Sequence, residues 1–396
     1  MNDFKKIYDN DLIKPNYNEA NIIDLIRTIY NYCGTNFKQN KNIKKIQEII
    51  VNKKHIIFVV VDGLGSNLLE NLPNNSLLKQ NKKTDIISVF PSATGCVLNS
   101  LATAQFPSKT GIYGWYGYYR KKDLNFYTLL LKDRKTNENL QVNNSEIFKY
   151  KSKINQLKRN KIVLYPNYLV DSRYSKYVAE DNIRVGYSDY KEAIERIKTH
   201  ILNQEKTFTY LYIPEIDSLE HKYGVKDKKV YDKIKELEEA IELLLPLNEE
   251  TELIITADHG QTDITDIITM NFAKYNKYFY ALPSIDMGTA TYFVKPEFLE
   301  EFSCEFEKDY NEKMLLYETN KMIDKGFFGE KPSNYAKESL GEFVSVCKKG
   351  YAFYNALDDY DDSKCIKGNH TGLTKDEMFV PLIVINNIIE EKEKST

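Results

Sequence analysis

The sequence predicts an α/β fold, a doubly wound and mostly parallel sheet with a small α+β subdomain beside it. Two observations support this prediction. Short runs of β-branched and aromatic residues recur along the chain, as in HIIFVVV at residues 55–61, and such runs are typical of strands buried on both faces of a parallel sheet. Stretches with helical periodicity lie between them, and alternation of strands with helices indicates βαβ units.

Five segments are expected to form core strands, and each adjoins a polar loop. The pairs are HIIFVVV with DGLG, DIISVF with PSATG, TFTYLYI with PEIDSLEH, TELIITA with DHGQTD, and FVPLIVI with the preceding GNHTGLTKDEM. Helical periodicity is clearest at residues 188–202 and 230–247. Because open α/β sheets place their functional sites beyond the carboxyl ends of the strands, these loops are where chemistry is expected.

The sequence pattern divides the chain into three parts. Residues 1–50 are polar with helical periodicity in two places, and we expect a helical leader packed on the core. The core would span residues 51–285 and 365–390. Residues 286–364 contain the strand-like segments GTATYFV and EFVSVCKKGYAFY and a helical stretch, which favours a small α+β subdomain inserted beside the site.

Bulk composition excludes several classes of function. The net charge of −2 gives no reason to expect general nucleic-acid or membrane-surface binding. Five cysteines, odd in number and without a CxxC pair, indicate a reduced, cytoplasmic protein. The N-terminus lacks the apolar core of a signal peptide, and no apolar run is long enough to predict a membrane span.

Two candidate site residues follow the first two strands. Asp62 stands directly before Gly63, where the chain can turn and the carboxylate can reach a cation. Thr94 precedes a helical-looking stretch, and a hydroxyl near a helix N-terminus lies in a positive potential that favours an alkoxide or a bound anion. Taken singly, Asp62 is more often a solvated or capping residue, and Thr94 a helix N-cap.

The next loop contains Asp217 and His221, which are four residues apart. On a helix these side chains lie one turn apart on one face, a spacing that suits a shared metal. An ordinary surface pair on a first helical turn is the competing interpretation.

Two further loops contain Asp258, His259 and His370. Neighbouring residues in a strand point to opposite faces, so Asp258 and His259 can face one target only if the chain has left the strand. His370 lies between two glycines, and alone it is more often an exposed loop residue. Imidazole and carboxylate groups together are the ligands that zinc prefers.

In order and spacing, these segments resemble the type I phosphodiesterase/nucleotide pyrophosphatase family of the alkaline phosphatase superfamily. The resemblance covers about residues 55–385 and lies in VVVDGLG, VFPSATGCVLNSLATAQFPSKTGIYG, YIPEIDSLEHKYG, ITADHGQTD and GNHTGLTKDEMFVPLIV. It implies an alkaline phosphatase-like core and a metal-dependent hydrolase that acts on a small-molecule phosphate ester.

The resemblance also implies a role for each candidate residue. Two divalent metal ions, expected to be Zn²⁺, would be bound by two sets of ligands. The first set is Asp62, Thr94, Asp258 and His259, and the second is Asp217, His221 and His370. Thr94 would be the nucleophile, and a phosphothreonine intermediate would then be hydrolysed.

The sequence departs from the family near the expected substrate. Diesterases of this family usually carry an Asn close to the turn that GIYG forms, and Trp115 stands there instead. Asn99 is the nearest alternative amide. Trp115 and Tyr116 could stack a flat group, since stacking contributes about 1–3 kcal/mol per base, although they equally suit a strand of buried aromatics. Asn99, Trp115 and Tyr116 are therefore candidate substrate contacts.

Three functions stay open on the sequence. The leading hypothesis is a two-metal phosphodiesterase or nucleotide pyrophosphatase that uses Thr94. A phosphomonoesterase or phosphonate hydrolase of the same superfamily would keep the metals and change the substrate. A non-catalytic pseudoenzyme would keep only the fold, and the complete set of ligand types argues against it.

Overall fold

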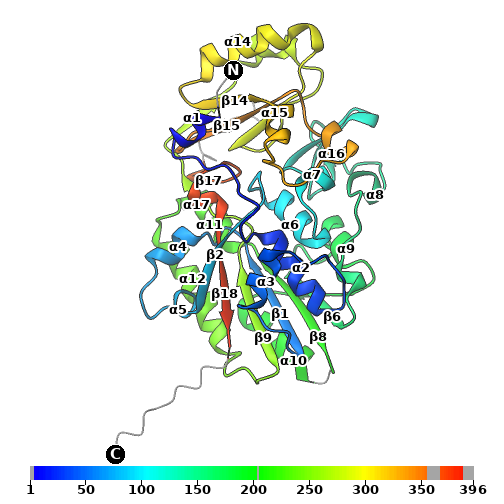
Figure 1. Cartoon of the computed structure of the whole chain (residues 1–396), viewed down its shortest axis with the longest axis vertical. Coiled ribbons are helices and arrows are strands. Elements are labelled where there is room, and N and C mark those ends of the chain that lie inside the picture. Colours follow the sequence, from blue (N-terminus) through cyan, green and yellow to red (C-terminus); the bar gives the residue numbers. More distant parts are fainter. Residues whose placement is uncertain (1–3, 203–204, 355–365, 387–396) are drawn as a thin grey trace, which may run out of the picture.

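A seven-stranded sheet forms the half of the molecule that carries the C-terminal strand (Figure 1). The computed structural model describes residues 4–202, 205–354 and 366–386. In spatial order the strands are β2 (Lys82–Ile87), β18 (Phe379–Ile385), β9 (Thr251–Thr256), β1 (His55–Val61), β8 (Thr207–Ile213), β6 (Asn160–Pro166) and β7 (Ile183–Tyr187). Only β18 runs antiparallel to its neighbours. The predicted mostly parallel α/β sheet is confirmed.

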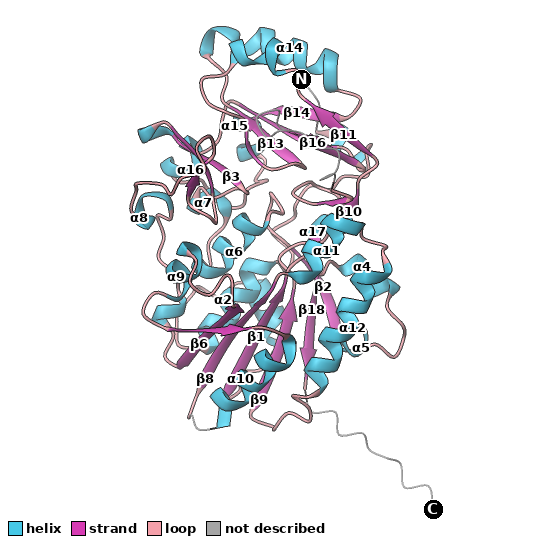
Figure 2. Cartoon of the chain, turned by 180° about the vertical axis from the view of Figure 1, so that it is seen from behind, coloured by secondary structure: helices cyan, strands magenta, loops and turns pink. Residues whose placement is uncertain are grey.

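Helices cover both faces of this sheet (Figures 1 and 2). The longer ones are α2 (Ile22–Tyr32), α3 (Lys41–Gln47), α6 (Thr94–Thr103), α9 (Arg173–Ala179), α10 (Tyr190–Leu202), α11 (Glu215–Tyr223) and α12 (Lys228–Glu242). Two shorter helices, α4 (Ser66–Asn71) and α5 (Leu77–Asn81), connect β1 to β2. The two helical patterns predicted at residues 188–202 and 230–247 correspond to α10 and α12, although α12 ends at Glu242, five residues before the predicted end.

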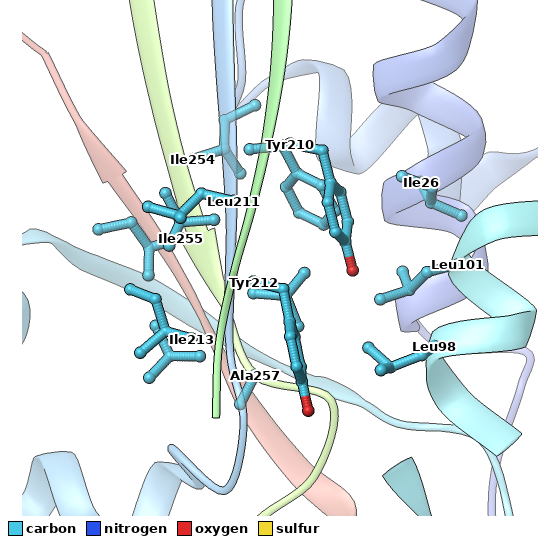
Figure 3. Packing of buried hydrophobic residues seen from close by; sticks show 14 of the residues in the cluster. Ile26, Leu98, Leu101, Tyr210, Leu211, Tyr212, Ile213, Ile254, Ile255 and Ala257 are labelled. Atoms are coloured by element: carbon cyan, nitrogen blue, oxygen red, sulfur yellow. The ribbon is translucent and has the colours of Figure 1, made fainter. Parts of the chain in front are cut away.

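Strand β8 shows how the two faces are packed. Figure 3 shows Tyr210 and Tyr212 on the same side of β8, facing Leu98 and Leu101 of α6. Leu211 and Ile213 alternate with them and point to the other face of the sheet. There they line an apolar space beside α10 and α12. Since successive side chains of a strand point to opposite faces, a strand between two helical layers must be apolar or aromatic throughout.

A second sheet lies at the other end of the molecule (Figure 2). Its order is β14 (Met314–Glu318), β15 (Phe343–Cys347), β13 (Thr289–Tyr292), β12 (Ser284–Ile285), β3 (Tyr116–Tyr119), β4 (Leu124–Tyr127) and β5 (Lys132–Asp133). Helix α14 (Leu299–Tyr310) packs on it through Phe302 and Phe306. Residues 116–133 therefore belong to this layer, although the sequence division placed them with the core.

Shorter α-helices and strands, with four 3₁₀-helices at Arg120–Lys122, Ile154–Gln156, Asn276–Tyr278 and Pro296–Phe298, make up the remaining elements of the described chain. The helices are α1 (Lys5–Tyr8), α7 (Pro107–Thr110), α8 (Asn144–Ile147), α13 (Phe272–Tyr275), α15 (Thr319–Asp324), α16 (Asn334–Glu338) and α17 (Lys375–Met378). Two small ladders pair β10 (Thr262–Asp263) with β17 (Gly368–Asn369), and β11 (Asp266–Thr269) with β16 (Tyr351–Tyr354). The division at residues 50, 285 and 365 stays a prediction.

Two expectations from composition concern the cysteines and membrane-spanning segments. Cys33, Cys96, Cys304 and Cys347 are free thiols, while Cys365 lies outside the described part of the chain. Within that part, no helix combines the length and the apolar character needed to cross a bilayer.

Candidate metal centre

The seven predicted site residues meet at one edge of the large sheet. Each comes directly after a strand or from an adjoining helix: Asp62 after β1, Thr94 at the start of α6, Asp217 and His221 on α11, Asp258 and His259 after β9, and His370 after β17. The carboxyl ends of parallel strands share one edge, so residues that follow β1 and β9 are brought together although the sequence separates them widely.

Asp217, His221 and His370 form the first cluster. Asp217 Oδ1 lies 3.3 Å from His221 Nε2 and 3.8 Å from His370 Nε2. One possible ligand atom from each of the three residues lies within 4.8 Å of the others. This is the set that the family resemblance predicted for one metal.

Asp62, Asp258, His259 and Thr94 surround the second position. His259 Nε2 lies 3.4 Å from Asp62 Oδ1, 3.4 Å from Asp258 Oδ2 and 3.1 Å from Thr94 Oγ1. Asp62 and His259 also form a three-ligand group with Asp217. Asp217 is therefore within reach of both positions.

Backbone carbonyls fix the orientation of two of the three imidazole rings. Nδ1 of His221 lies 2.8 Å from the oxygen of Gly368, and Nδ1 of His370 lies 2.9 Å from that of Ser92. A carbonyl oxygen only accepts, so Nδ1 carries the proton in both rings and donates it. Their Nε2 atoms then face the site with a free lone pair, which is the arrangement that metal-ligating histidines adopt.

The buried carboxylates fit a cation. Asp62 Oδ1 and Asp258 Oδ2 are buried and accept no hydrogen bond from the described residues. Burial and repulsion from Asp258 and Asp217 raise the pKa of Asp62 well above its usual range. Three carboxylates this close in a buried site cannot all stay ionised without positive charge. Divalent cations bound among these oxygens and the three Nε2 atoms would supply that charge.

The same groups predict how pH changes the stability. Burial and the charge of Asp217 raise the pKa of Asp258 to about 7. Burial lowers the pKa of His221, but the charge of Asp217 outweighs it and raises that pKa to about 9. Between about pH 6.5 and pH 9 the folded, metal-free chain therefore holds protons that the unfolded chain has lost, so its stability falls as pH rises.

Metal ligands must be deprotonated, so metal affinity rises with pH, whereas the stability of the metal-free chain falls. We expect the difference in Tm between zinc-loaded and EDTA-treated protein to widen from pH 6.5 to pH 9. Thermal unfolding at several pH values measures it directly. A difference that narrows over this range would show that these groups are not the ligands.

Two residues that hold the ligands were missed from the sequence. The hydroxyl of Tyr212 donates a short hydrogen bond to Asp62 Oδ2, and the amide of Gln261 donates to Asp217 Oδ1. Tyr212 lies within a predicted strand and has the pattern of an ordinary core residue, so only the position of its hydroxyl reveals it. Tyr212 leaves Asp62 Oδ1 for a metal, while Gln261 fixes Asp217 through Oδ1, the oxygen that also faces His221 and His370.

Replacing Tyr212 by Phe should weaken metal binding. The change removes the donor to Asp62 and keeps the buried ring, and loss of such a partner typically costs about 10–100-fold in metal affinity. Competition titration with a zinc chelator measures the affinity. Tyr210→Phe is the matched control, since Tyr210 lies on the same side of the same strand (Figure 3). Equal affinity of the two variants would contradict the role of Tyr212.

The three candidate substrate contacts have different surroundings. Asn99 is 1% exposed, and its amide donates to the hydroxyl of Tyr177 on α9. Trp115 is half-buried and packs edge-on against Tyr127. Tyr116 lines a pocket together with Asp286. The roles predicted for all three stay predictions.

Comparison with known families agrees with this geometry. The family model described as type I phosphodiesterase/nucleotide pyrophosphatase matches residues 56–373, well over half of the chain. The chain belongs to this family. Its members hydrolyse phosphoric esters, and the alkaline phosphatase superfamily that contains them uses divalent metals. All seven predicted residues lie within the matched region.

Solved structures of this superfamily share the fold. Murine ectonucleotide pyrophosphatase/phosphodiesterase 5 superposes with a TM-score of 0.63 at 16% identity, over 84% of this chain and 88% of that one. Phosphonoacetate hydrolase from Sinorhizobium meliloti 1021, in complex with phosphonoacetate, gives a TM-score of 0.62 at 14% identity, over 85% and 91%. No curated protein matches the sequence.

Proposed function

We propose that this chain is a two-metal phosphodiesterase or nucleotide pyrophosphatase-like hydrolase with Thr94 as its nucleophile. The convergence of seven ligand-type side chains on one sheet edge carries the proposal, with Thr94 Oγ1 only 3.1 Å from His259 Nε2. The metals we propose are two Zn²⁺ ions, because imidazole and carboxylate ligands suit zinc.

Thr94 is well placed for nucleophilic attack. It is the first residue of the ten-residue helix α6, where the backbone favours negative charge. The ring of His259 presents Nε2 to its hydroxyl, because Nδ1 faces the carbonyl oxygen of Gly260 at 3.3 Å. Support also comes from the murine relative, in which a threonine-to-alanine variant, solved in complex with AMP, is inactive.

The reaction would proceed in two displacements. The Thr94 oxygen forms a bond to phosphorus as the bond to the leaving alkoxide breaks, which gives a phosphothreonine ester. Water then displaces the threonine oxygen from phosphorus. Bound divalent cations would lower the pKa of the attacking hydroxyl or water and stabilise charge on the entering and leaving oxygens.

Charge balance suits an anionic substrate. Two divalent ions contribute +4 and the carboxylates of Asp62, Asp217 and Asp258 contribute −3, so the site would carry +1 while Thr94 is neutral. Once the Thr94 alkoxide forms, the sum is zero. A phosphate ester is thus attracted before the attack, and the developing negative charge stays compensated.

A phosphonate hydrolase or phosphomonoesterase is the second candidate. Trp115 replaces the amide expected near the phosphoryl group of diesterases, and one of the similar folds is a phosphonoacetate hydrolase. Either reaction would use the same metals and Thr94. For location and partners we propose a cytoplasmic protein that acts on small-molecule phosphate esters.

Comparative kinetics with zinc present tests the proposal. We expect the purified protein to cleave bis-(p-nitrophenyl) phosphate or a p-nitrophenyl nucleotide ester faster than p-nitrophenyl phosphate or phosphonoacetate. Preference for the monoester or the phosphonate would establish the second candidate. No turnover of any of them, with no metal bound, would favour a pseudoenzyme.

A further inference from the structure

Thr371, the residue that follows the predicted ligand His370, has a strained backbone. Its φ is 80°, in the left-handed region that glycine adopts freely and β-branched residues avoid. Its side chain is buried. Such strain persists only where the surrounding structure over-determines it, and it is concentrated at functional sites. The contacts of Thr371 therefore identify what the strained conformation provides.

The backbone of Thr371 is bonded to the loop that leads to Thr94. Its N–H donates to the oxygen of Ser92 at 3.1 Å, and the same oxygen faces Nδ1 of His370 at 2.9 Å. The hydroxyl of Ser92 donates in turn to the oxygen of Gly372 at 3.2 Å. Ser92 stands two residues before Thr94. One carbonyl thus fixes both the His370 ring and the backbone beside it relative to the start of α6.

The turn between β12 and β13 of the second sheet holds Thr371 by two further hydrogen bonds. The N–H of Gly288 donates to Thr371 Oγ1 at 2.8 Å, and the hydroxyl of Thr289 donates to the oxygen of Thr371 at 2.6 Å. A Cβ atom at position 288 would overlap the carbonyl oxygen of His370, so only glycine lets the turn come this close. The second sheet therefore lies directly against the backbone of a predicted metal ligand.

A threonine at position 371 provides a contact that glycine would lack. Glycine would adopt this φ without strain, but it has no hydroxyl to accept from the N–H of Gly288. That N–H is buried, and a buried donor without a partner is unfavourable. The hydroxyl of Thr371 thus satisfies a donor of the second sheet, which compensates for the unfavourable backbone.

We propose that Thr371 is the positioning residue of His370 and that, through it, the second sheet becomes part of the metal centre. This inference rests on the proposed function, in which His370 is a ligand of the first cluster. The bonds to Ser92 and Gly288 hold the loop so that His370 Nε2 lies 3.8 Å from Asp217 Oδ1. Partners that orient a ligand raise metal affinity. Loss of the Thr371 hydroxyl should therefore weaken the metal at the first cluster and leave the second position occupied.

Zinc titration of Thr371→Val tests this inference. The substitution keeps the β-branched shape and removes the acceptor of the Gly288 N–H. We expect the affinity of one zinc ion to fall by about 10–100-fold, the usual effect of losing a group that orients a ligand, while the other ion binds as in the wild type. Competition with a zinc chelator resolves the two binding steps, and His370→Ala identifies the step that belongs to the first cluster. Thr371→Ser, which restores the hydroxyl, should restore the affinity.

Thr291→Val is the matched control. Thr291 is buried on β13, where its hydroxyl accepts from the N–H of Gly341 at 2.8 Å and donates to the oxygen of Phe343 at 3.0 Å. These partners are of the same kind as those of Thr371 but lie outside the His370 loop. Thr291→Val should lower the Tm of the metal-free protein and leave both zinc affinities unchanged. Equal zinc affinities in Thr371→Val and Thr291→Val would mean that Thr371 is only structural, and would overturn the inference.

Thr289→Val reaches the same contact from β13. It removes the hydrogen bond to the carbonyl of Thr371 without changing the strained residue itself, so it is informative even if Thr371→Val does not fold. It should weaken the same zinc ion that His370→Ala loses. Unchanged affinity for that ion would contradict the inference.

The two proposals fail in different ways. If the wild-type protein hydrolyses no phosphate ester while Thr371→Val selectively loses zinc, the proposed function fails and the positioning role stands. If diesters are hydrolysed but Thr371→Val binds zinc as Thr291→Val does, the hydrolase stands and the positioning role fails.

Discussion

Thr94→Ala should abolish hydrolysis while metal binding is kept. The substitution removes the only hydroxyl within hydrogen-bond distance of His259 Nε2 among the described residues. Removal of a nucleophile typically costs about 10³-fold or more in kcat. The six Asp and His side chains stay, so metal content should remain near two per chain. Steady-state kinetics and elemental analysis of the same preparation measure the two quantities.

Thr103→Ala is the matched control for this result. Thr103 lies on the same helix and donates to the backbone oxygen of Asn99, away from the metal centre. It should keep nearly wild-type turnover, and Thr94→Ser, which restores a hydroxyl, should recover part of the lost rate. If Thr94→Ala turns over as fast as Thr103→Ala, Thr94 is not the nucleophile.

Asp217→Asn should remove activity by a different route, the loss of metal. Asp217 is in both groups of possible ligands, and its Oδ1 lies 3.3 Å from His221 Nε2. The neutral amide of Asn removes one negative charge that would otherwise face both metal positions. We expect bound metal to fall from two per chain to below one and kcat/KM to fall by about 10³-fold or more.

The same substitution at an exposed aspartate controls for this effect. Asp232→Asn on α12 breaks only a surface pair with Lys228, which contributes about 0.3–0.5 kcal/mol at most. Its metal content and rate should match the wild type. Two tightly bound metals in Asp217→Asn, with activity within tenfold of wild type, would show that Asp217 is not a shared ligand.

The large sheet could be predicted from local signals, whereas the grouping of the seven residues into one site came from the resemblance to the family. Apolar β-branched runs mark β1 and β9, and the polar residue after each run marks where the strand ends. Asp217 and His221 are four residues apart on α11, a spacing that places both side chains on one face of the helix. Periodicity is sufficient for these strands and helices, but it does not distinguish a metal ligand from an ordinary polar loop residue.

Other elements depend on pairings that local pattern cannot reveal. Strand β7 is a half-exposed edge strand with Arg184 and Gly186 in its centre, so its sequence lacks a clear apolar run. Strands β3 to β5 enter the second sheet because Tyr116 pairs with Ile285, more than 160 positions away. Tyr212 acts through one hydroxyl, whose direction depends on the register of its strand.

The stereochemical course at phosphorus tests the central claim most directly. The account requires two successive in-line displacements, by Thr94 and then by water, and each inverts phosphorus. Hydrolysis of a chiral phosphorothioate diester in ¹⁸O-water should therefore proceed with net retention of configuration. Net inversion would mean that water attacks phosphorus directly, and the phosphothreonine mechanism would be wrong even if both metals are bound.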